Sequence, residues 1–221
     1  MNILKKLLEK KSRFNLMPVG FHGDTYLMDL VDFLINTGVE VFIETGTNVG
    51  STLAYVAKSY PDIMCYSCEP DPEAYQHATR NTSNFSNVKI YNQLSQDFMI
   101  SLKKNHQDIF GKKCLVWIDA HSYGFRWPLQ EEISYFSEYL NSGYILIDDF
   151  QVPDKPMFSY DKFENQLCAH EYIKDYFKSN YKLYYPGYEE KTSKHHPLVG
   201  WGLYVFGAEP NGLGRIMAIT G

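Results

Sequence analysis

The sequence predicts an α/β fold in which helices cover both faces of a mostly parallel sheet. Three observations support this prediction. Short apolar segments alternate with segments of helical periodicity along most of the chain. Most of the apolar segments end in a carboxylate, and the first leads through a glycine-containing turn into a helix. The chain has 221 residues, which is long enough to bury one continuous core.

After two N-terminal helical segments, the expected elements alternate between strand and helix. Helices are expected over 3–16, 26–36, 50–59, 71–81, 96–105, 127–140 and 166–179. Strands are expected over 39–44, 63–69, 88–92, 114–119, 143–149, 181–188 and 200–206. Asp24 and Asp71 are candidate N-caps, and Gly38 is a candidate stop signal. We expect a helical cap over 1–38, a ligand-binding domain over 39–208 and a tail over 209–221, within a single domain overall.

The overall charge argues against a nucleic-acid-binding protein. The formal net charge is −5, whereas binding to phosphates calls for clustered Lys and Arg. No apolar run approaches the roughly 18 residues of a membrane span, and the N-terminus lacks the apolar stretch of a signal peptide. We therefore expect a cytoplasmic protein that has neither nucleic acid nor a membrane as a partner.

The four cysteines show no disulfide pattern. Cys65 and Cys68 have the spacing of a metal or redox pair, but they lie within an expected strand. Side chains three positions apart on a strand point to opposite faces of the sheet. Buried free thiols are therefore the better interpretation.

Acidic residues gather at the ends of the expected strands. The carboxyl ends of parallel strands lie at one edge of a sheet, where open α/β sheets bind ligands. The residues expected at this edge are Glu44, Glu69, Asn92, Asp119 and the pair Asp148 and Asp149. Four of these five strand ends carry carboxylates, so this edge is the candidate functional site.

The turn after the first expected strand is a candidate cofactor loop. It begins at Glu44, and Gly46 and Gly50 allow the backbone to approach a ligand before a helix begins. Glu69 can accept hydrogen bonds from both hydroxyls of a ribose. The G-x-G-x-x-G pattern of dinucleotide binding is absent, and Glu44 would repel a pyrophosphate but attract the cationic sulfonium and amino groups of S-adenosylmethionine. An NAD-dependent reductase remains an alternative.

Together, these features resemble the class I S-adenosylmethionine-dependent methyltransferases over roughly 39–206. The resemblance implies a Rossmann-like, doubly wound, mostly parallel seven-stranded sheet with an antiparallel last strand. The loop reads E-x-G-x-x-x-G in place of the commoner E/D-x-G-x-G-x-G, which leaves the contacts of Thr47 and Asn48 open. Ser95 is expected near the adenine, with a helix N-cap as its alternative role. The implied cofactor-binding residues are Glu44, Thr45, Gly46, Thr47, Asn48, Gly50, Ser51, Glu69, Ser95, Asp119, Ala120 and His121.

Three carboxylates are expected to meet beside the cofactor loop, namely Asp119, Asp148 and Asp149. Such a cluster is repulsive unless a cation joins it or one carboxyl is protonated, and Mg²⁺ typically binds carboxylates, waters and substrate oxygens. The arrangement resembles the metal-dependent macrocin O-methyltransferase group, which implies these three residues as ligands of Mg²⁺ or another divalent cation. Alternatively, Asp148 or Asp149 caps the following loop, or Asp119 binds the methionine amino group without a metal.

The expected function is metal-assisted methylation of a hydroxyl on a small molecule or sugar. A divalent ion lowers the pKa of a bound alcohol, and a nearby base removes its proton. His121 is the first candidate base, and Asp119 or Asp149 is the second. The segment 122–128 is expected to form an acceptor wall, unless Trp127 packs beneath the following helix. The alternatives are metal-independent N- or C-methylation and a non-catalytic nucleotide-binding protein, and the N-terminal helices are expected to form a lid or a homodimer surface.

Overall fold

A computed structural model of the chain describes residues 20–120, 127–190 and 197–213. The expected helix over 3–16, the candidate base His121 and the segment 122–126 lie outside the described residues. Among the described residues, no helix combines the length and the apolar character that a membrane crossing requires.

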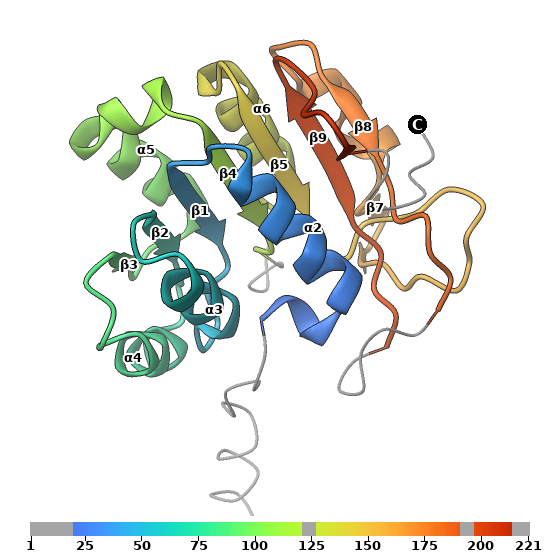
Figure 1. Ribbon diagram of the computed structural model, residues 1–221. Coiled ribbons are helices and arrows are strands. Elements are labelled where there is room, and N and C mark those ends of the chain that lie inside the picture. Colours follow the sequence, from blue (N-terminus) through green and yellow to red (C-terminus); the bar gives the residue numbers. More distant parts are fainter. Residues whose placement is uncertain (1–19, 121–126, 191–196, 214–221) are drawn as a thin grey trace, which may run out of the picture.

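The main sheet has seven strands in the order β3-β2-β1-β4-β5-β9-β8. Its strands are β1 (Val41–Thr45), β2 (Met64–Cys68), β3 (Val88–Tyr91), β4 (Cys114–Ile118), β5 (Gly143–Ile147), β8 (Lys182–Tyr184) and β9 (Gly202–Phe206). The first five pair in parallel, and β9 pairs antiparallel with both β5 and β8. This arrangement, drawn in Figure 1, confirms the predicted doubly wound sheet with an antiparallel last strand.

The strand order reverses between β1 and β4. From β1 the chain proceeds outward to β2 and β3, and it then returns to place β4 and β5 on the other side of β1. The loops that leave β1 and β4 therefore diverge at the carboxyl edge of the sheet. Open α/β sheets bind ligands at such a switch point.

Helices cover both faces of the sheet. They are α2 (Thr25–Asn36), α3 (Ser51–Ser59), α4 (Pro72–Asn81), α5 (Ser95–Asn105), α6 (Leu129–Tyr139) and the one-turn α7 (His170–Ile173), with the 3-10 turns η1 (Phe21–Gly23), η2 (Gln107–Gly111) and η3 (Lys174–Tyr176). Buried side chains of α2 and α3 pack in the core on one face, and those of α5 and α6 pack in the core on the other. Figure 1 shows α2 lying across the sheet.

Several local predictions are confirmed. Asp24 caps α2 and Asp71 caps α4, and each accepts two backbone N–H groups. Gly38, just beyond the end of α2, has a φ of 96°. Cys65 and Cys68 belong to the cores on opposite faces of the sheet, and both are buried free thiols.

The helix expected over 166–179 is confirmed only in part, because α7 and η3 make residues 170–176 helical. The first residues of the range instead form β7 (Gln166–Leu167), which pairs with β6 (Lys162–Phe163) in a hairpin. The Cys168 N–H donates to the Asp161 oxygen at 3.0 Å, and the Cys168 oxygen accepts from the Gln151 N–H at 2.7 Å. These long-range bonds occupy backbone groups that a continuous helix would need, so helical structure begins only at His170. The strand expected over 181–188 is likewise limited to β8.

Candidate cofactor and metal site

The loop after β1 is tied to the strands on both of its sides. The N–H groups of Gly46 and Thr47 donate to the Cys68 oxygen at 3.1 and 3.0 Å, which fixes the loop to the end of β2. Gly46 has a φ of 85°, and a Cβ at this position would lie 2.2 Å from the backbone oxygen of Asp119. The loop therefore contacts the end of β4 through the backbone, which only glycine permits.

Glu44 lies beneath this loop and is 1% exposed. The Ser67 hydroxyl donates to its carboxylate at 2.6 Å and also bonds the hydroxyl of Thr47. Burial raises the pKa of Glu44 to about 8, and the charges of Asp119 and Glu69 act in the same direction. At this pKa the carboxyl group is mostly protonated at neutral pH, and a cation bound above the loop would favour its ionised form.

This raised pKa predicts how the stability of the protein depends on pH. The folded pKa is about 8 and the ordinary value is 4.5, so between these values the folded state retains a proton that the unfolded state releases. The contribution of Glu44 to the free energy of unfolding is therefore fully present below pH 4.5 and is lost as the pH rises through 8. The loss amounts to at most about 5 kcal/mol.

Urea unfolding of the wild type and Glu44→Gln across this pH range measures the effect. The variant is expected to gain stability relative to the wild type as the pH rises, because an amide does not ionise. Glu40→Gln is the matched control, because Glu40 is exposed and lies just before β1, at the opposite end of the strand. A Glu44→Gln curve parallel to that of the wild type would contradict the prediction.

Glu69 follows β2 at the same edge and faces the β1 loop. Its Oε2 accepts from the Asn48 N–H at 2.7 Å, and its Oε1 accepts from the Asp71 N–H at 2.9 Å. Burial raises the pKa of Glu69, and these two hydrogen bonds oppose the rise. Each carboxylate oxygen can accept a further bond, so the group can also bind two hydroxyls of a ligand.

Ser95 is the first residue of α5, which begins close to the end of β3. Its alternative role as an N-cap is wrong, because Leu94 occupies that position and no side chain caps this helix. The Ser95 Oγ is buried and has no hydrogen-bond partner among the described residues. Because leaving a buried hydroxyl unpaired is unfavourable, this oxygen is suited to a polar atom of a ligand.

Asp119 and Asp148 lie side by side after β4 and β5. These strands pair in parallel, and the Asp148 N–H extends the pairing by donating to the Ile118 oxygen at 3.0 Å. Asp148 is 3% exposed, and its Oδ1 has no hydrogen-bond partner among the described residues. Asp149 comes next in a left-handed conformation with a φ of 47° and is half-buried.

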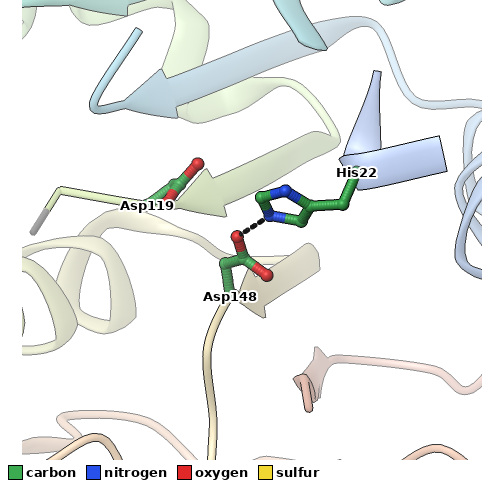
Figure 2. A group of neighbouring side chains, drawn as sticks. All are labelled: His22, Asp119 and Asp148. Atoms are coloured by element: carbon green, nitrogen blue, oxygen red, sulfur yellow. Dashed lines mark hydrogen bonds and ion pairs between the residues drawn. The ribbon is translucent and has the colours of Figure 1, made fainter. Parts of the chain in front are cut away.

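A histidine that precedes the first helix of the described chain joins these aspartates. The ligand atoms of His22, Asp119 and Asp148 all lie within 4.8 Å of one another. Figure 2 shows the three side chains and the hydrogen bond between His22 Nε2 and Asp148 Oδ2. Burial lowers the pKa of His22, but Asp148, Asp119 and Asp149 together outweigh this effect and raise it to about 9. Asp149, the third predicted ligand, is not part of the close group within the described part of the chain.

Sequence reasoning missed His22, because contacts distant in the sequence determine where it lies. It belongs to η1 and has a φ of 55°, and Phe21 before it has a φ of 50°. Phe21 is buried against the rings of Trp117 and Tyr55, with centroid separations of 5.0 and 5.8 Å. These contacts hold the turn at the end of the sheet to which the arrowheads of β1, β4 and β5 point (Figure 1). In the sequence, only the two flanking glycines indicate a turn.

The remaining predicted residues have simpler positions. Thr45 is buried at the end of β1, Thr47 is buried in the loop that follows, and Ser51 is the first residue of α3. Ala120 is half-buried beside Asp119. Trp127 is buried in the core beside α6, which confirms the alternative expectation for this residue.

The fold is that of solved methyltransferase structures. The O-methyltransferase TomG from Streptomyces achromogenes, involved in tomaymycin synthesis and solved with S-adenosylmethionine, has a TM-score of 0.61 at 13% identity, over 92% of this chain and 89% of its own. An O-methyltransferase from Bacillus cereus, solved with S-adenosylhomocysteine, has a TM-score of 0.58 at 14% identity, over 92% and 90%. The precorrin-6y C5,15-methyltransferase from Geobacter metallireducens has a TM-score of 0.53 at 16% identity, over 82% and 88%. No protein-family model and no curated protein matches the sequence.

Proposed function

We propose that this chain is an S-adenosylmethionine-dependent methyltransferase that methylates a hydroxyl oxygen of a small molecule or sugar with the help of a divalent metal ion. One observation carries the proposal. A cluster of buried and half-buried acidic side chains lies beside a glycine-dependent loop at the switch point of the sheet. Such a cluster suits a cationic donor and a hard metal ion better than it suits a nucleotide pyrophosphate.

The proposed cofactor site extends from the β1 loop to the start of α5. Glu69 accepts hydrogen bonds from the ribose hydroxyls, and the backbone at Gly46 approaches the methionine part of the cofactor. The buried hydroxyl of Ser95 bonds the adenine. Glu44 supplies negative charge beneath the sulfonium. Two structures of this fold were solved with S-adenosylmethionine or S-adenosylhomocysteine, which supports this assignment.

The ends of β4 and β5 fit a divalent cation. Asp119 and Asp148 present adjacent carboxylates, and one buried oxygen of Asp148 has no hydrogen-bond partner among the described residues. Asp149 is proposed as a further ligand on the basis of the sequence. A divalent ion bound here would act as a Lewis acid that lowers the pKa of the acceptor hydroxyl. The two aspartates place the acceptor hydroxyl next to the β1 loop. His121 is proposed as the base that takes the proton of this hydroxyl.

A second candidate is methyl transfer without a metal. The hydrogen bond between His22 and Asp148 favours it, because the raised pKa of His22 keeps the imidazole protonated at neutral pH, and the imidazolium offsets the charge of Asp148 without a metal ion. In this candidate function, Asp119 binds the amino group of the cofactor directly, and the acceptor atom is nitrogen, carbon or an activated oxygen.

An activity assay with metal control separates the two candidates. Purified protein is incubated with S-adenosylmethionine and mixtures of hydroxylated acceptors, and S-adenosylhomocysteine is quantified by mass spectrometry. Turnover that EDTA abolishes and added Mg²⁺ or Mn²⁺ restores supports the metal-assisted reaction, whereas turnover that resists EDTA supports the second candidate. Cofactor binding without turnover indicates a non-catalytic protein. Tighter binding of NAD than of S-adenosylmethionine contradicts both enzymatic candidates.

Glu69→Gln is expected to weaken S-adenosylmethionine binding about 10- to 100-fold. A hydrogen bond to a charged group contributes roughly 1.5–3 kcal/mol, and glutamine keeps the size of the side chain while removing its charge. Isothermal titration calorimetry measures the affinity. Glu138→Gln, on the exposed side of α6, is the control and keeps the wild-type affinity. Unchanged binding by Glu69→Gln would exclude Glu69 from the ribose site.

A further inference from the structure

We propose that His22 is a protein ligand of the metal ion at Asp119 and Asp148, and that this mixed ligand set selects a divalent transition-metal ion such as Mn²⁺ over Mg²⁺. The inference rests on the proposed metal-assisted function. It adds a ligand that the strand-end pattern of the sequence does not contain, and it specifies the class of metal.

The three ligands come from three separate elements. His22 lies on η1, Asp119 follows β4 and Asp148 follows β5, and Figure 2 shows the imidazole next to both carboxylates. Their ligand atoms lie within 4.8 Å of one another. A first-row divalent ion binds nitrogen and oxygen at about 2.0–2.2 Å, so two of its ligands are at most about 4.4 Å apart. Small side-chain rotations are therefore enough to place all three ligand atoms around one ion.

The bonding of Asp148 also points to a ligand. The residue is 3% exposed, and Oδ1 has no hydrogen-bond partner among the described residues. A metal ion would complete the bonding of this carboxylate.

The turn that carries His22 is fixed on both of its sides. Phe21 packs against Trp117 before the histidine, and after it Asp24 caps α2 and bonds the Tyr188 hydroxyl. Between these anchors, Phe21 and His22 both adopt a left-handed backbone, which costs about 1–2 kcal/mol per residue. The fold thus holds the imidazole at the carboxylates against a conformational cost.

The chemistry of the ligand set determines which ion it prefers. Mg²⁺ binds oxygen and retains much of its water, and it gains little from an imidazole nitrogen. An imidazole nitrogen is a better ligand for first-row transition-metal ions than for Mg²⁺, and sets of histidine and carboxylate ligands with open positions are typical of Fe²⁺. One histidine with two aspartates is therefore better matched to an ion of this class.

Titration of the full chain with Mn²⁺, followed by the electron paramagnetic resonance signal of the free ion, tests the inference. We expect the wild type to bind one Mn²⁺ and His22→Gln to bind it at least tenfold more weakly. Competition experiments with Mg²⁺ are expected to show that His22→Gln loses less affinity for Mg²⁺ than for Mn²⁺. His106→Gln is the matched control, because His106 lies away from the cluster and forms a 2.9 Å hydrogen bond with the Tyr91 hydroxyl. This variant is expected to keep the wild-type affinity for Mn²⁺.

Electron spin echo spectroscopy of bound Mn²⁺ identifies the ligand directly, because a coordinated imidazole nitrogen gives a ¹⁴N coupling. We expect the coupling in the wild type and in His121→Gln, and its absence in His22→Gln. If His22→Gln does not fold, the wild type and His121→Gln decide the question without it.

Three outcomes overturn the inference. They are a wild-type spectrum without ¹⁴N coupling, a coupling that disappears only in His121→Gln, and wild-type Mn²⁺ affinity in His22→Gln. If Asp148→Asn still abolishes Mn²⁺ binding in those cases, the metal-assisted function stands without His22. If the wild type binds neither Mn²⁺ nor Mg²⁺, the inference and the role of the metal both fail, while cofactor binding is tested separately by calorimetry.

Discussion

Asp119→Asn is expected to lower kcat/KM for methyl transfer by about 10²–10³-fold while the chain keeps its fold. The substitution conserves the size of the side chain but removes a negative charge from the group that Asp119 forms with His22 and Asp148. Removing one electrostatic contact at the reacting centre typically has an effect of this size. Asp119 also lies beside the β1 loop, so the proposed metal site and the proposed acceptor position both depend on it.

The measurement is a steady-state assay of S-adenosylhomocysteine formation, with circular dichroism as the check on folding. Asp62→Asn is the matched control, because Asp62 is exposed in the turn before β2, at the opposite edge of the sheet. It is expected to keep full activity. A folded Asp119→Asn protein with wild-type kcat/KM would show that the carboxylate takes no part in the reaction.

Gly46→Ala is expected to abolish S-adenosylmethionine binding and to destabilise the protein by roughly 3 kcal/mol. The added Cβ would lie 2.2 Å from the Asp119 oxygen and 2.6 Å from its carbonyl carbon, and the φ of 85° adds backbone strain. The β1 loop or the end of β4 must move to relieve the contact. Either movement disturbs the proposed cofactor loop together with the group of His22, Asp119 and Asp148.

Gly38→Ala separates the effect of strain from the effect of the clash. Gly38 has a φ of 96°, but no atom lies within 4 Å of a Cβ built there, so the control adds strain without a contact. The Gly38→Ala protein is expected to lose about 1 kcal/mol in its free energy of unfolding and to bind the cofactor with wild-type affinity. Thermal unfolding and calorimetry measure both variants, and equal behaviour of the two would show that the contact at Gly46 is unimportant.

The parts of the fold that depend on local chemistry could be predicted from the sequence. Asp24 and Asp71 cap the helices that follow them, and the apolar runs before Glu44, Asp119 and Asp148 are buried strands. The region of 166–179 could not be predicted in this way. The residues of this region favour a helix, but the backbone of Cys168 forms hydrogen bonds with Asp161 and Gln151, which lie 7 and 17 positions earlier in the chain.

The candidate site likewise contains residues that the strand pattern predicts and one residue, His22, that it does not. Parallel strands bring their ends to one edge whatever the details of packing, so the positions of Glu69, Asp119 and Asp148 follow from the strand pattern alone. His22 follows no strand, and its position depends on tertiary contacts such as the packing of Phe21 against Trp117. Such a contact depends on the shapes of two rings distant in sequence, and periodicity and spacing contain no information about it.

The bond between His22 and Asp148 joins residues 126 positions apart, and the bond between Tyr188 and Asp24 spans 164 positions. A nascent polypeptide on the ribosome cannot form the first bond until residue 148 has emerged, and it cannot form the second until residue 188 has emerged. Contacts between such distant residues also form slowly, since a long loop must close first. Chains that terminate before residue 148 therefore lack the hydrogen bond that joins His22 to the carboxyl edge of the sheet.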